Sequence, residues 1–238
     1  FYLSLLKVLG SYGIGIFISL LSYGNFFGQL TTLGIDNQYL LTTLDSKSNN
    51  ILIFISYFKK IIKPIIINIL ISIICGIFIF KLNNLSSLFL VSVLVIYLPL
   101  SQLIQSQFIA SNNTLYKILW FSLQPWIKSL GIIFLLLFYR NNLNNINELL
   151  INAKFKTGFF MAIIIIIMSL FVIKNLKNIS KKIQIKSISK RFENKNQNLY
   201  FGIDHMNFHA VLSLTVPVSS IFLDNISTSS LALAYSIY

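Results

Sequence analysis

The segment at residues 85–109 places the strongest constraint on the fold, because it runs without a single charged side chain. A membrane-crossing helix needs about 20 consecutive and mostly apolar residues. Over the whole chain hydrophobic residues make up 55% and charged residues only 11%, whereas about a quarter of the residues are charged in an ordinary soluble domain. The sequence therefore predicts an all-α membrane protein with several membrane-spanning helices.

Apolar runs of similar length recur along the chain. We expect the end of a first helix at 1–8 and the beginning of an eighth at 231. The complete spans are predicted at 13–40, 61–80, 85–109, 115–139, 157–173 and 205–223. Because the chain opens at Phe1 and stops as a new apolar run begins, we expect it to be an internal piece of a longer protein.

The basic residues indicate how these spans are oriented. The chain contains 19 Lys and Arg residues but only six Asp and Glu residues. Consecutive spans must alternate sides, and this puts the segments 45–63, 110–117 and 174–195, which hold thirteen of the basic residues, on one face. Cytoplasmic loops of membrane proteins are enriched in Lys and Arg. We therefore expect these segments in the cytoplasm and the segment 140–156 outside.

The longest polar stretch covers 174–200. Isoleucines at regular spacing within it fit either an amphipathic helix lying on anionic lipid or a plain cytoplasmic linker. Membrane topology explains the excess of positive charge. The sequence contains no motif typical of nucleic-acid binding, of nucleotide binding or of a zinc site. The lone Cys75 cannot form a disulfide within the chain.

A family resemblance emerges at residues 9–40, LGSYGIGIFISLLSYGNFFGQLTTLGIDNQYL. A small-residue loop, a glycine-aromatic start of a span and a Leu-Gly-Ile-Asp near its end occur together there. In these features the chain resembles the polysaccharide exporters and O-antigen flippases of the multidrug/oligosaccharidyl-lipid/polysaccharide superfamily. The stretch 224–238, DNISTSSLALAYSIY, looks like the matching junction between helices seven and eight of that family.

The resemblance implies a two-lobe helical transporter in the cytoplasmic (inner) membrane. It implies an N-terminal six-helix lobe at 1–175 with its first helix truncated, a basic cytoplasmic linker at 176–203, and the start of a C-terminal lobe at 204–238. The implied function is flipping of an oligosaccharide on a polyprenyl pyrophosphate by alternating access, with membrane lipids as further partners. Coupling to Na⁺ or H⁺ is implied as an option, and no cofactor is expected.

Lys128 is the first candidate for contact with substrate. It lies within the predicted span at 115–139, where a charge costs at least about 2.5–3.5 kcal/mol and normally faces a cavity or a partner. In the family that the chain resembles, cationic residues of the cavity between the lobes meet the pyrophosphate. Snorkelling to the interface and a structural pairing with helix-end carbonyls stay open as alternatives.

Three amides accompany it. Gln124 lies in the same span as Lys128, and Gln102 and Gln105 share one face of the span before it, at 60° to one another. Amides of this kind can bind sugar hydroxyls. They can equally hold helices together, at about 1–2 kcal/mol or less for each contact.

Asp36 ends the Leu-Gly-Ile-Asp pattern. A cap at the membrane interface and a pairing with a lysine of a neighbouring span are equally compatible with its position. Gly24 and Gly28 of the same predicted span are spaced so that two helices can approach closely.

Asp204, His205 and His209 open the predicted seventh span. The histidines are spaced to share a helix face, which suits coupling to protons or a metal, while polar groups at headgroup level are the alternative. We expect no metal site and no enzyme, since a catalytic residue set is missing from the sequence. The alternatives to a flippase are a multidrug or cation antiporter, which requires acids within the membrane, and a polysaccharide polymerase or membrane glycosyltransferase, which requires a large external loop.

Overall fold

The computed structural model describes residues 2–32, 34–45, 50–110, 146–180, 215–219, 221–223, 227 and 230–231. Within these ranges the chain is almost entirely helical and holds no strand. The long helices are α1 (Tyr2–Thr32), α2 (Ile35–Asp45), α3 (Asn50–Phe78), α4 (Leu85–Ala110) and α6 (Ile146–Ser180). The predicted spans at 115–139 and 205–223 lie outside the described residues, except for the last part of the second.

Four of these helices, α1, α3, α4 and α6, are long and apolar enough to cross a membrane. Large apolar side chains cover their outer surfaces, most extensively on α3 and α6. A surface of this kind suits the hydrocarbon interior of a bilayer, where apolar side chains have no reason to be covered. The prediction of an all-α membrane protein is therefore confirmed for the described part of the chain.

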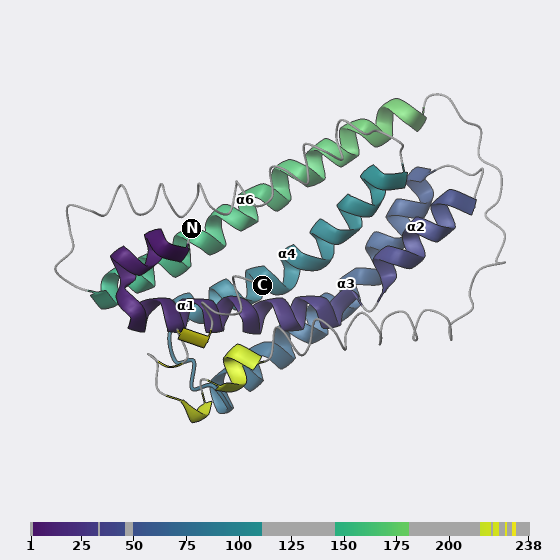
Figure 1. Cartoon of the computed structure of the whole chain (residues 1–238). Helices are drawn as coiled ribbons and strands as arrows, with labels where there is room; N and C mark the ends of the chain where they lie inside the picture. The colour runs from purple at the N-terminus through teal and green to yellow at the C-terminus, as the bar shows by residue number, and fades with distance from the viewer. Residues whose placement is uncertain are drawn as a thin grey trace.

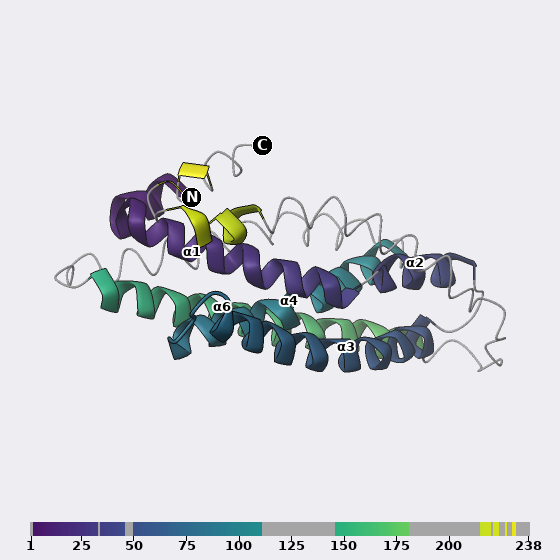
Figure 2. The ribbon, with the colours of Figure 1, turned by 90° about the horizontal axis from the view of Figure 1, so that it is seen from below.

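Helix α4 is the centre of the arrangement and contacts each of the other four helices. In Figure 1, α6, α4 and α3 lie side by side, and α1 crosses over them. The view in Figure 2 shows α1 and α2 above the layer that the other three helices form.

Two glycines allow α1 and α4 to approach closely. A Cβ atom added at Gly24 would lie 2.7 Å from Leu94 Cδ1, and one added at Gly28 would lie 2.9 Å from Leu98 Cβ. The residue numbers of both helices rise together along this contact, so α1 and α4 run parallel. The close helix contact that the spacing of Gly24 and Gly28 predicted is thus present.

Helix α3 runs in the opposite direction beside α1. The hydroxyl of Tyr23 donates a hydrogen bond to the carbonyl oxygen of Ser72 (2.7 Å), and the amide of Asn68 donates to Thr31 Oγ1 (3.0 Å). Later residues of α1 therefore meet earlier residues of α3.

Helix α6 runs parallel to α4, because Lys154 contacts Ser87 and Gly158 packs against Phe89. The alternation of predicted spans requires α1, α4 and α6 to share one direction and α3 to oppose it, and the contacts agree. The end of α1, the start of α3 and the ends of α4 and α6 lie toward the same end of the molecule (Figure 1). This is the end that the three basic segments of the sequence adjoin.

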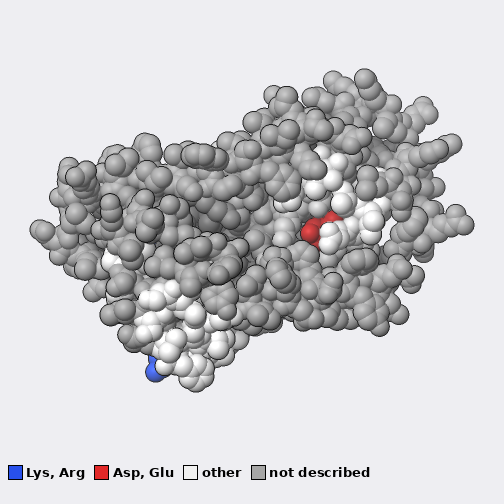
Figure 3. Space-filling view, viewed as in Figure 1, with Lys and Arg blue, Asp and Glu red and all other residues white. Residues whose placement is uncertain are grey.

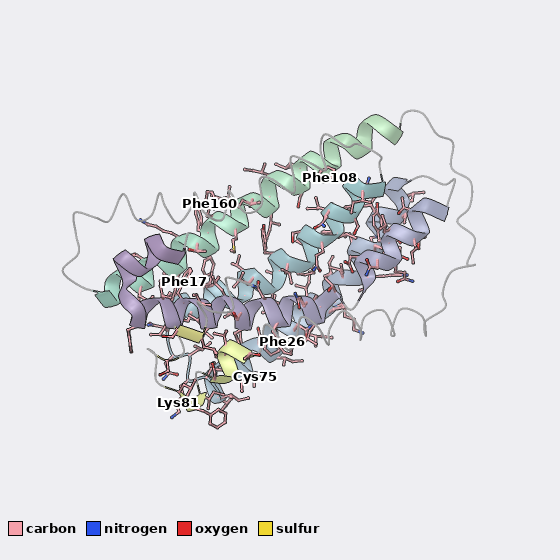
Figure 4. All side chains as sticks on the ribbon, in the orientation of Figure 1. Phe17, Phe26, Cys75, Lys81, Phe108 and Phe160 are labelled. Carbon is pink, nitrogen blue, oxygen red and sulfur yellow. The ribbon has the colours of Figure 1, made fainter. Side chains whose placement is uncertain are left out.

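Two apolar clusters form the core. The larger one joins α1, α4 and α6 and contains Phe17, and the smaller one joins α2, α3 and α4 and contains Tyr39 and Phe108. Figure 4 shows Phe17 and Phe108 toward opposite ends of the bundle, and Phe160 on α6. Among the described residues visible on the face in Figure 3, basic atoms occur at one place and acidic atoms at another.

Several predicted boundaries are wrong. The predicted span at 13–40 is two helices, since α1 ends at Thr32 and α2 begins at Ile35, after Gly34 with its positive φ of 75°. The predicted end of a first helix at 1–8, by contrast, agrees with the structure, because two helical parts of α1 meet at Gly10, where φ is 67° and ψ is 174°. Glycine adopts such angles without the strain that a Cβ atom brings.

The predicted loops are also shorter than expected. Residues 50–63, assigned to a basic loop, form the first half of α3, and residues 146–156, assigned to an external loop, form the beginning of α6. In both cases buried apolar residues continue the helix beyond the uninterrupted apolar run, among them Ile53, Tyr57 and Leu150. At its other end α6 continues to Ser180. It therefore includes the first residues of the linker predicted at 176–203. Residues 181–203 lie outside the described ranges.

Candidate functional site

Most residues of the predicted substrate and coupling sites lie outside the described residues. These are Lys128, Gln124, Asp204, His205 and His209. Their roles therefore stay predictions, and the site can be built from the described residues alone.

Asp36 lies in the first turn of α2, directly after the break at Gly34. A carboxylate is favoured there because the unpaired N–H groups give the start of a helix a partial positive charge. Within the described part of the chain no salt bridge joins Asp36 to a lysine, and its side chain is half-buried. Of the two sequence interpretations, this position favours the helix cap at the end of the α1 span.

Gln102 and Gln105 lie on α4, one and two turns beyond Leu98, which packs against α1. Both side chains are half-buried, and the Oε1 atom of Gln102 is buried without a hydrogen-bond partner among the described residues. A buried acceptor without a donor costs about 1–3 kcal/mol. No hydrogen bond between described residues joins either glutamine to Asp36, so the structure does not bring these predicted residues into one site.

Lys154, which the sequence predicts in an external loop, is buried instead. Lys154 of α6 is only 3% exposed, and its ammonium donates a hydrogen bond to Ser87 Oγ of α4 (2.9 Å). No carboxylate among the described residues forms a salt bridge with it. Burial of a cation with a neutral partner costs several kcal/mol, since a hydroxyl replaces only part of its hydration.

The start of α4 adds to the positive potential around Lys154. Ser87 is in the first turn of α4, which contains no acidic residue. The N–H groups of such a turn carry the positive end of the helix dipole. Ser86 is 1% exposed and its Oγ has no hydrogen-bond partner within the described part of the chain. We term the buried contact of Lys154 with the first turn of α4 the Lys154 site (Lys154, Ser86 and Ser87).

The chemistry of the Lys154 site suits an anion. An ammonium group and hydroxyls are donors that commonly bind phosphate oxygens. The N–H groups of Ser87 and Leu88 already donate to the carbonyl oxygen of Asn84, so the lysine and serine side chains are the donors that this site offers. Among the described residues there is no group of three His, Cys, Asp or Glu side chains that could hold a metal ion.

Helical spacing offered a signal for the Lys154 site. Lys154 continues a stripe of buried positions on α6, formed by Leu150, Thr157, Gly158, Met161 and Ile164. Residues three, four and seven apart lie on one helix face. Read as a helix from residue 146, the sequence places Lys154 on the face that carries the core residues. Treating 140–156 as a loop removed that signal.

Comparisons with protein-family models, with curated proteins and with solved structures find no match.

Proposed function

We propose that this protein is a transporter that flips a lipid-linked oligosaccharide, carried on a polyprenyl pyrophosphate, across the cytoplasmic membrane by alternating access. The observation that carries the proposal is Lys154, a lysine with 3% exposure in an apolar helix contact. Among the described residues its one hydrogen-bond partner is a serine hydroxyl. The resemblance at residues 9–40 supplies the substrate class.

A pyrophosphate-linked substrate fits this environment for electrostatic reasons. The Lys154 site contains a lysine and no acidic residue. An anion that binds there would therefore offset the cost of burying the ammonium. Lys154 also lies in a helix whose segment Leu150–Ile167 is apolar enough to span a membrane. Charged side chains within spans commonly mark the paths of substrates and ions.

The site is closed in this structure, as one state of an alternating-access cycle requires. For the substrate to reach Lys154, α6 and α4 must separate at Ser87. The apolar outer faces of α3 and α6 would let the prenyl tail stay in the bilayer while its headgroup moves along the protein. In this mechanism the protein makes and breaks no covalent bond, so it is not an enzyme.

Two alternatives have less support. A multidrug or cation antiporter needs acidic residues inside the membrane, and Asp36, the best candidate in the sequence, lies in α2 beyond the end of the α1 span. A polymerase or glycosyltransferase needs a large external loop, and the start of α6 at Ile146 shortens the predicted loop at 140–156.

The test compares Lys154→Met and Lys154→Arg in proteoliposomes. The probe is a fluorescent prenyl-pyrophosphoryl disaccharide, and flipping is measured by the fraction that a membrane-impermeant reductant can reach. Methionine keeps much of the volume and removes the charge, so we expect the protein to stay folded and flipping to fall at least about tenfold. Arginine should retain part of the activity because it also binds phosphate.

Lys156→Met is the matched control, because Lys156 is on the same helix two residues away and only half-buried. It should flip the probe at the normal rate. Normal flipping by the Lys154→Met protein would refute the phosphate role of Lys154. Equal transfer of a fluorescent phosphatidylcholine by the unmodified protein would refute selectivity for the pyrophosphate-linked substrate.

A further inference from the structure

Helix α3 carries a basic patch on its outer surface near its first half. Lys59, Lys60 and Lys63 are all exposed, although the helix around them is apolar. With 100° between successive residues, these three lysines fall within an arc of about 100° on one side of the helix. We refer to them as the α3 lysine patch.

An apolar stripe continues from this patch along the same side of α3. At about 100° per residue its members point in directions within about 60° of Lys63. They are highly exposed, and the stripe consists of Ile66 (55% exposed), Ile67 (45%), Leu70 (57%), Ile74 (55%) and Ile77 (40%). The three lysines thus lie directly before this stripe on one helix face, and exposed Leu52 and Ile55 precede them on the same face.

The length of α3 places the α3 lysine patch near a membrane surface. The candidate span Leu52–Phe78 has 27 residues, which corresponds to about 40 Å of helix at about 1.5 Å per residue. The hydrocarbon core is only about 30 Å thick. The part from Lys59 to Phe78 measures roughly 28 Å by the same rise. With Phe78 at one edge of the hydrocarbon, Lys59 therefore lies close to the other edge. Lys63 starts about 6 Å deeper, a distance that a lysine side chain can span by snorkelling to the headgroups.

The lysine patch is also connected to the helix that follows α1. The ammonium of Lys60 lies over the ring of Tyr57, 4.8 Å from its centroid. The hydroxyl of Tyr57 is 2.9 Å from Thr42 Oγ1 of α2 and hydrogen-bonded to it. Within the described residues no salt bridge joins Lys59 or Lys63 to an acid, so both charges are available to an external anion.

We propose that this face of α3 binds an anionic phospholipid. Its phosphate lies between Lys59 and Lys63, and its acyl chains follow Ile66, Leu70 and Ile74. Juxtamembrane lysines attract anionic lipid headgroups, while the apolar stripe offers a surface only to a ligand that also has a tail. Through Lys60, Tyr57 and Thr42, the bound lipid steadies the junction of α2 with α3. This site is separate from the Lys154 site, which lies at the opposite end of α4 from the α3 lysine patch.

The test uses the full chain purified in a neutral detergent. Retention of dioleoylphosphatidylglycerol and of dioleoylphosphatidylcholine is measured by native mass spectrometry, together with the thermal stability of the protein. We expect preferential retention of phosphatidylglycerol and a higher melting temperature in its presence. Lys59→Gln/Lys63→Gln should weaken that retention by at least about tenfold, since each lysine near a surface contributes substantially to attraction of anionic lipid. Lys59→Arg/Lys63→Arg should retain it.

Lys81→Gln is the control, because Lys81 is exposed but lies where α3 ends, away from the patch (Figure 4). It should leave lipid retention unchanged. Equal retention of the two lipids by the unmodified protein would refute the proposal, as would unchanged retention by the double glutamine variant. Displacement of phosphatidylglycerol by inorganic phosphate alone would show a simple anion site and refute the role of the tail.

Discussion

Gly24 of α1 lies directly against Leu94 of α4, so that a Cβ atom on Gly24 would be 2.8 Å from Leu94 Cβ. One turn later, Gly28 approaches Leu98 in the same way. Both contacts lie where α1 packs on α4. They set how closely α1 can approach the central helix.

Gly24→Ala should therefore destabilise the protein, by about 1–3 kcal/mol, because a methyl group has no room without movement of Leu94. The measurement is the melting temperature of the purified protein in detergent. Gly76→Ala is the control, since its added Cβ would lie 3.2 Å from the tip of the Leu82 side chain, which can move. A second replacement, Leu94→Ala, should cost less in the Gly24→Ala protein than in the unmodified protein. Full additivity of the two changes would contradict the contact.

Gly10→Ala tests backbone strain without a steric clash. No atom lies within 4 Å of a Cβ added at Gly10, but its φ of 67° and ψ of 174° are angles that glycine alone tolerates well. We expect a loss of about 1–3 kcal/mol, or a straightened and altered first turn of α1. Melting temperature and protease sensitivity near residue 10 report these two effects. A melting temperature and a cleavage pattern identical to those of the unmodified protein would show that the kink is not required.

Membrane orientation can be tested by cysteine labelling in intact cells, after Cys75 is replaced by serine. A cysteine at Asn83, which is exposed between α3 and α4, should react with a membrane-impermeant reagent added from outside. A cysteine at Ser187, within the basic segment 174–195, should react only after the cells are opened. The reverse pattern would place the basic segments outside and overturn the predicted topology.

Lys128 remains the sharpest prediction that comes from the sequence alone. If it meets a phosphate, Lys128→Arg should keep export, Lys128→Gln should lose most of it, and Lys128→Glu should be worst because its charge repels the substrate. Surface polysaccharide in a strain lacking the native gene, with the amount of membrane-inserted protein measured in parallel, gives the answer. Full export by Lys128→Gln at a normal protein level would remove Lys128 from the substrate path. Loss of the protein itself would assign the lysine a structural partner.

The sequence by itself determined that the protein lies in a membrane, that it is helical, and in which relative directions the described helices run. A charge-free run such as 85–109 has few alternatives to a membrane helix, because apolar length alone decides insertion. The basic segments predicted which helix ends lie on the same side of the membrane. The spacing of Gly24 and Gly28 predicted a close helix contact. These are local properties of composition and spacing, which no tertiary contact has to supply.

The tertiary structure alone decided where helices end and which charges are buried. Helical spacing separates Lys154 from Lys156 only if the helix is known to begin near residue 146. The packing of α6 on α4 sets that start and buries Lys154 against Ser87, while Lys156 is half-buried. In the same way Lys59 and Lys63, read from the sequence as loop residues, belong to α3 because Ile53 and Tyr57 pack beneath that part of the helix. Burial depends on contacts between segments far apart in the chain. A helix gains another turn only where such contacts outweigh the loss of conformational entropy in that turn.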